Sequence, residues 1–163
     1  MDIQRYFVEG DLDGESYEIL LRACSDISSF FGIVEYGNSV SGLKDTHIHA
    51  DVLLPYFFKS EIVFKWPGSV LGAQSKGATR FLYRTNFESI NLLLSLTSSL
   101  WDWGNSGMPN DLHFLRDDES TVFGSTWCTE NAWFELTDKE FLTVNPLLKE
   151  HFRLVKDIES NSN

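Results

Sequence analysis

The sequence predicts an α+β fold: a mixed, largely antiparallel sheet with about three helical regions packed on it. Two stretches repeat apolar residues at helical spacing, and several short runs of aromatic and β-branched residues are separated by turn-forming residues. The 163 residues contain no internal repeat and no shift in composition. We therefore expect one domain over residues 1–163, with residues 158–163 as a disordered tail.

The first third of the chain predicts a strand, a helix and a second strand. Ile3–Glu9 has strand character, and Asp13 then offers a side-chain oxygen to the first free amides of a helix. The run Phe30–Tyr36 predicts the second strand, before a loop over 38–44. The apolar positions of the helix follow the 3.6-residue period: Tyr17, Leu20, Leu21, Cys24 and Ile27.

The middle of the chain predicts two strands and the clearest helix. Glu61–Trp66 should place Ile62, Phe64 and Trp66 on one side of a strand that Pro67-Gly68 ends. A polar connection, 69–77, then leads to a strand over Thr79–Arg84. Thr85 and Glu88 have capping-box spacing, which predicts a helix over 86–101.

The C-terminal part predicts a meander followed by two short helices. Strands are expected over 112–115, 122–127 and 132–136. Thr137 and Glu140 repeat the capping-box spacing, and Asn145-Pro146 is typical of a further helix start.

The charge balance bears on partners. Thirteen basic and 24 acidic residues give a net charge of -11, which disfavours nucleic acids and anionic membranes and favours encounter with a basic protein. The chain lacks an apolar run of membrane-spanning length and an export signal, so we expect a cytoplasmic protein. Cys24 and Cys128 are then expected to be reduced packing residues, and no cofactor is predicted.

One local pattern favours metal chemistry. On a strand, His47, His49 and Asp51 would share one face, and these are the ligand types of a hydrolytic metal site. The remaining histidines, His113 and His151, are not placed near them by the sequence. A metal-dependent hydrolase is therefore the alternative hypothesis. Cys128 is a further candidate nucleophile only if a histidine approaches it.

Aromatic and acidic residues supply candidates for partner binding. Trp101, Asp102 and Trp103 stand beside a Gly-rich loop, where indoles offer rigid contact area. In the competing interpretation Trp101 belongs to the core and Trp103 caps the end of the helix. Acidic groups near 9–18, 117–119 and 130–140 are suited to a basic partner. The partner-binding prediction comprises Trp101, Asp102, Trp103, Asp117, Asp118, Glu119 and Glu130.

From Trp66 onward the chain resembles a family of small uncharacterised bacterial proteins. The shared motifs are Trp66-Pro67-Gly68, Phe81-Leu82-Tyr83-Arg84, the helix after them, Pro109-Asn110-Asp111-Leu112-His113-Phe114-Leu115, and Glu135-Leu136. Where that family usually has Ser-x-x-His-Glu, this chain has Ser125-Thr126-Trp127-Cys128-Thr129, so no role of a His-Glu pair is carried over.

The leading functional prediction is a non-enzymatic binding protein. Small acidic bacterial proteins of this kind are often immunity proteins that neutralise a basic toxin, and the resemblance implies that role by analogy. No complete catalytic constellation is present in the sequence. An assembly subunit that binds its own copy is a third hypothesis.

Overall fold

The computed structural model describes residues 2–36, 48–105 and 107–158. An eight-stranded sheet has the order β10-β1-β9-β8-β7-β2-β6-β3, and every pairing in it is antiparallel. Its strands are β1 Gln4–Glu9, β2 Phe30–Tyr36, β3 Phe57–Val63, β6 Ala78–Arg84, β7 Asn110–Leu115, β8 Thr121–Thr126, β9 Asn131–Leu136 and β10 Arg153–Lys156. The α+β prediction is confirmed.

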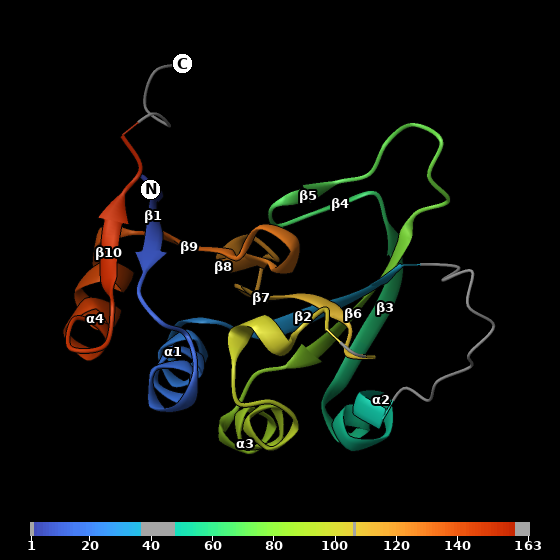
Figure 1. Cartoon of the computed structure of the whole chain (residues 1–163), viewed down its shortest axis with the longest axis horizontal. Helices are drawn as coiled ribbons and strands as arrows, with labels where there is room; N and C mark the ends of the chain where they lie inside the picture. The colour runs from blue at the N-terminus through green and yellow to red at the C-terminus, as the bar shows by residue number, and fades with distance from the viewer. Residues whose placement is uncertain (1, 37–47, 106, 159–163) are drawn as a thin grey trace.

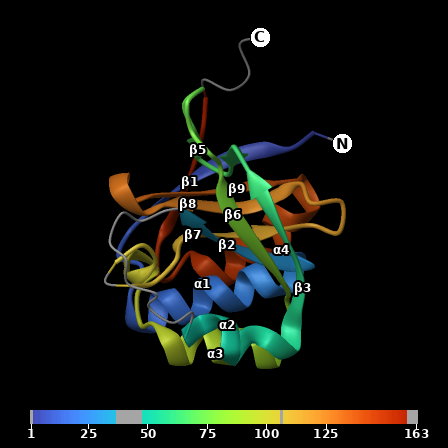
Figure 2. The same ribbon diagram turned by 90° about the vertical axis from the view of Figure 1, so that its right-hand side faces the viewer.

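The two faces of the sheet are covered differently. The four described α-helices lie along one face, and a small hairpin stands on the other, as Figures 1 and 2 show from two sides. The helices are α1 Gly14–Ile27, α2 Ile48–Leu53, α3 Phe87–Leu96 and α4 Asp138–Leu148, and the hairpin joins β4 Lys65–Trp66 to β5 Ser69–Val70. The short 3-10 helices are η1 Leu54–Tyr56, η2 Leu100–Asp102 and η3 Trp127–Thr129. No described helix is long and apolar enough to cross a membrane.

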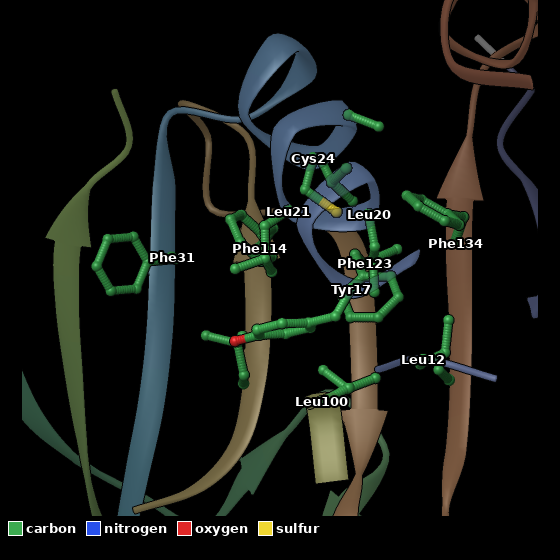
Figure 3. Packing of buried hydrophobic residues seen from close by; sticks show 14 of the residues in the cluster. Leu12, Tyr17, Leu20, Leu21, Cys24, Phe31, Leu100, Phe114, Phe123 and Phe134 are labelled. Carbon is green, nitrogen blue, oxygen red and sulfur yellow. The ribbon is translucent and has the colours of Figure 1, made fainter. Parts of the chain in front are cut away.

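The main core lies between the sheet and α1. Tyr17, Leu20, Leu21 and Cys24 form the buried face of this helix, as the sequence period predicts. Phe114, Phe123 and Phe134 approach it from three adjacent strands (Figure 3). Burying such side chains contributes about 1.5–3 kcal/mol each, so this layer is the chief source of stability.

Several predicted elements are confirmed. The strands Ile3–Glu9, Phe30–Tyr36 and Thr79–Arg84 appear as β1, β2 and β6, and the C-terminal meander appears as β7 to β9. The Thr137–Glu140 capping box is present. Glu140 also accepts a hydrogen bond of 2.8 Å from Arg116 Nε, which ties the β7–β8 turn to α4. Burial raises the pKa of Glu140, but the hydrogen bonds from Arg116 and Thr137 outweigh it and leave the pKa below its ordinary value.

The predicted helix 86–101 is wrong in its cap and its length. Asn86 and Ser89 form the capping box, one residue beyond the predicted Thr85–Glu88 pair. The helix ends at Leu96, and η2 follows after a break. At α1, Asp13 occupies the N-cap position, but its side chain makes no capping hydrogen bond.

Three further predictions are corrected by packing. The strand over Glu61–Trp66 is split between β3 and β4, so Ile62 is exposed while Trp66 is buried. The 69–77 connection begins with β5. The two C-terminal helices are one helix, because Val144 and Leu148 are buried on either side of Pro146 and hold its last turn in place. The predicted loop 38–44 lies outside the described residues, as does the predicted tail apart from Ile158.

His113 is sealed inside the sheet face opposite the helices. It stands directly across from Gly32, where a Cβ atom would overlap its Nε2. Nδ1 lies 2.8 Å from the Asp111 carbonyl oxygen, so Nδ1 carries the hydrogen, while Nε2 has no partner among the described residues. Burial lowers the pKa of His113 most, the hydrogen bond to Asp111 opposes it, and the Arg80 charge adds to the lowering, so that the resulting pKa is about 4.

Because the folded-state pKa lies below the ordinary 6.5, the unfolded chain binds a proton that the folded chain excludes between about pH 6.5 and pH 4. The free energy of unfolding should therefore fall on acidification through this window, by up to about 1.4 kcal/mol per pH unit from this group. Urea unfolding of wild type and His113→Gln at several pH values measures the difference. Equal pH slopes for the two proteins would contradict the assignment.

Candidate functional site

A connected pair of hollows lies where β8 ends beside η2 and the β1–α1 loop. The larger has a volume of about 640 Å³ and the smaller about 240 Å³, and they share Trp101 and Glu130. We call them together the acidic groove. The larger hollow is lined by Trp101, Asp102, Asn105, Trp127, Cys128, Thr129 and Glu130, and the smaller adds Val8, Gly10, Asp11, Leu12, Asp13 and Ser99.

The floor of the groove is built by η2. Leu100 is buried and anchors this turn, and its backbone N–H donates to the Leu12 carbonyl at 2.9 Å. Asp102 accepts from the backbone N–H of Ser98 and of Ser99, at 3.2 and 3.1 Å. These bonds tie η2 to itself and to the β1–α1 loop, so residues from two parts of the chain hold a common surface.

Trp103 lies beneath this surface and belongs to the core. It is only 1 % exposed, and its Nε1 donates to the Tyr17 hydroxyl at 2.9 Å. Tyr17 also shares a 2.9 Å hydrogen bond with the Thr97 hydroxyl, and burial raises the pKa of Tyr17 to about 12. The prediction that Trp103 binds a partner directly is therefore wrong, because its indole holds the loop to α1.

Asp111 holds the other wall of the groove. Its Oδ1 accepts from the backbone N–H of Trp127 at 3.0 Å, and its Oδ2 accepts from Trp66 Nε1 at 2.8 Å and from Ser69 Oγ at 3.3 Å. The carboxylate is nearly buried, and a positive φ of 54° turns the chain at this residue. One side chain thus fixes both η3 and the β4–β5 hairpin.

Gly104 allows the Trp127 indole to lie against the loop after η2. A Cβ atom at this glycine would come within 2.6 Å of the indole, and its φ of +105° is unfavourable for other residues. Trp127 remains 38 % exposed, so one part of its ring is packed and the rest faces solvent. Glu130 follows at the left-handed end of η3, which places its side chain on the groove rim.

The structure divides the predicted partner-binding residues between two places. Trp101, Asp102 and Glu130 gather in the groove. Asp117, Asp118 and Glu119 lie in the turn before β8, at its opposite end. There Glu119 binds Lys59 at 2.6 Å and Arg80 at 3.2 Å. Asp118 accepts from the Ser120 hydroxyl and N–H, and these bonds lower its pKa.

The groove carboxylates differ in their partners from carboxylates elsewhere. Among the described residues, none of the ion pairs includes Asp11, Asp13, Asp102 or Glu130, and the groove lining contains no Lys or Arg. The basic side chains are engaged by other acids, as in Arg116–Glu140 at 2.7 Å. The groove therefore keeps an uncompensated negative charge.

Trp127 ends the predicted strand over 122–127, but it belongs to η3 and is a main wall of the groove. Asp11 and Asp13 fall within the predicted acidic segment 9–18. The contact between Gly104 and Trp127 could not be predicted from local sequence patterns, because the fold brings together two residues that are far apart in the chain. Cys128 is exposed on the groove wall rather than packed, whereas Cys24 is buried, and both are free thiols.

The geometry expected for a metal site is absent from the described segment. Ile48–Leu53 is a helix rather than a strand, so the two-residue alternation on which the prediction of a shared strand face depended does not apply there. His47 lies outside the described residues. The described residues contain no group of three or more His, Cys, Asp and Glu side chains able to hold a metal ion. No histidine lines the groove beside Cys128 within this part of the chain, so a base for that thiol is not provided there.

Comparison with known proteins found no matching family model, no similar curated protein and no similar solved structure. The fold and groove therefore define the chain only as an α+β protein with an acidic, indole-bearing surface.

The Asp111 network yields a stability prediction. Asn tolerates the left-handed backbone, but replacing one carboxylate oxygen by an NH₂ group sets a donor against a donor, either Trp127 N–H or the Trp66 indole N–H. We expect Asp111→Asn to lower the free energy of unfolding by about 1–3 kcal/mol. Urea unfolding measures this change, with exposed Asp117→Asn as the control. A cost no larger than that of the control would contradict the role.

Proposed function

We propose that the protein is a non-enzymatic binding protein that holds a basic protein segment in the acidic groove. The observation that carries this proposal is the combination of four carboxylates without a Lys or Arg partner among the described residues and two indoles in one hollow surface. Fixed negative charge speeds the encounter with a basic partner. Indoles are among the side chains that contribute most to binding energy at protein interfaces.

The side chains of the groove favour arginine in the partner. A guanidinium stacks on the face of an indole and simultaneously forms paired hydrogen bonds to a carboxylate. Trp127 and Glu130 offer these two features side by side, as do Trp101 and Asp102. An extended or helical segment with several Arg or Lys residues has the matching chemistry.

The finer proposal is that this basic partner is a toxin domain and that the protein is its immunity protein. Support comes from the resemblance to small bacterial proteins and from the net charge of -11. In this view the protein neutralises the toxin by occupying its basic surface, with no chemical step.

We expect a groove variant to lose the partner. Asp11→Lys combined with Glu130→Lys reverses two groove charges without touching the bonds of Asp102. The control combines Asp26→Lys with Glu150→Lys, which changes the net charge equally at exposed positions outside the groove lining. Affinity capture from native extract should yield a basic protein on wild type and control but not on the groove variant. With that protein purified, titration calorimetry should show a loss of at least about tenfold in affinity for the groove variant and for Trp127→Ala.

Two results would contradict the proposal. One is capture of the same proteins by wild type and by the groove variant. The other is an affinity that does not decrease with added salt, because exposed charge pairs are screened at high ionic strength.

A further inference from the structure

The strand β3 forms one open edge of the sheet, and apolar side chains gather along it. No described strand pairs with its outer side. Large apolar residues with more than a third of their surface exposed lie in and beside this strand: Leu54, Phe57, Phe58, Ile62 and Phe64. An apolar edge strand is a template for pairing with another strand.

The charges of β3 are arranged around Ser60. Lys59 stands opposite Leu82 and Glu61 opposite Arg80, so both charges project from the sheet face that lies away from the helices. Within one chain Glu119 binds Lys59 and Arg80 binds Glu61, and about a third of the Lys59 and Glu61 side chains remains exposed for further pairing. If a second β3 pairs antiparallel with Ser60 opposite Ser60, each Lys59 stands across from the partner's Glu61. The strand is therefore complementary in charge to its own copy.

The apolar side chains agree with the same register. Phe57, Ser60 and Ile62 pair with Tyr83, Phe81 and Thr79, which places all three on the helix-side face of β3. The bulge between Phe57 and Lys59 keeps Phe57 on that face. Rotation about an axis through Ser60 then brings the exposed Ile62 next to the partner's Phe57, twice in the dimer.

The opposite edge of the sheet lacks this complementarity. Strand β10 carries Arg153 at its start and Lys156 at its end. Antiparallel pairing of β10 with its own copy would offer no acid to either base, because the strand contains no acidic residue. Charged residues of this kind protect an edge from pairing. The β3 edge is therefore suited to pairing with its own copy, whereas the β10 edge is not.

We propose that two copies of this chain associate through β3, antiparallel about a two-fold axis at Ser60, and form one continuous sheet. The interface uses the backbone edge, two Lys59–Glu61 ion pairs and the Phe57–Ile62 contacts. It does not depend on the proposed groove function, because the groove is lined by η2, η3 and the β1–α1 loop and includes no residue of β3.

Sedimentation equilibrium of the purified full chain tests the association. Wild type should sediment at twice the mass of one chain and dissociate on dilution. Ile62→Lys should remain monomeric at every concentration, because Ile62 is 62 % exposed in the single chain and its replacement affects pairing rather than folding. Leu142→Lys, at a 73 % exposed position on α4, should still dimerise. A monomeric wild type, or an Ile62→Lys dimer, would overturn the proposal.

A cysteine on the axis tests the register. In a Cys128→Ser background, which leaves only the buried Cys24, Ser60→Cys places two thiols opposite each other. Mild oxidation should give a disulfide-linked dimer on a non-reducing gel, while exposed Ser95→Cys on α3 should not. Equal cross-linking at both positions, or none at position 60 in a protein that dimerises, rejects the two-fold pairing at Ser60.

Discussion

A single row of aromatic side chains crosses almost the whole sheet, and the rest of the fold is arranged around it. Each member stands directly opposite the next on the neighbouring strand. The row runs through Phe57, Tyr83, Phe31, Phe114, Phe123, Phe134 and Tyr6. A slip of one residue in any pairing would turn these rings to the other face, so burial of the row from Tyr83 to Tyr6 on the helix side sets the register of the sheet. Tyr6 extends the row into α4 by stacking on Phe141 at 4.7 Å.

The opposite face follows from this register and is built by different chemistry. Where the aromatic row fills one side, glycines leave room on the other: Gly32 for the His113 ring and Gly124 for the Trp133 indole. Polar bonds to Asp111 then attach the β4–β5 hairpin and η3 over this face. The helix-side face thus supplies most of the apolar burial, while this second face determines where the exposed loops are held.

Local patterns were sufficient to predict most elements but not how they end. The strand Phe30–Tyr36 and the buried stripe of α1 depend on periodicity, which a sequence displays directly. The cap of α3 moved by one residue because Asn86 and Ser89 also satisfy capping chemistry, and spacing alone does not choose between adjacent pairs. Strand β10 is paired only with β1, almost the whole chain away, so its short sequence carried little signal.

The sequence was sufficient to predict the types of residue in the candidate site, but not which of them the fold brings together. Aromatic and acidic residues near 101 and 130 were identified as binding residues, but their meeting with Asp11 and Asp13 depends on hydrogen bonds such as Leu100 N–H to the Leu12 carbonyl. Trp103 has nearly the same sequence neighbours as Trp101. It is nevertheless buried, because its indole N–H donates to the hydroxyl of Tyr17 in the core. Periodicity breaks down in a 3-10 turn, where successive side chains go to unrelated surroundings.

The distribution of ion pairs explains why the groove retains its charge. Arg80 and Lys59 are held by Glu61 and Glu119 over β6 and β3, and Arg116 is held by Glu140 at α4. With acids outnumbering bases by 24 to 13, pairing must leave some carboxylates over. In the described structure such carboxylates include those of the groove, where backbone N–H groups rather than cations hold Asp102. A basic partner would complete the pairing that this chain cannot complete alone, which is the physical reason for proposing the groove as the binding surface.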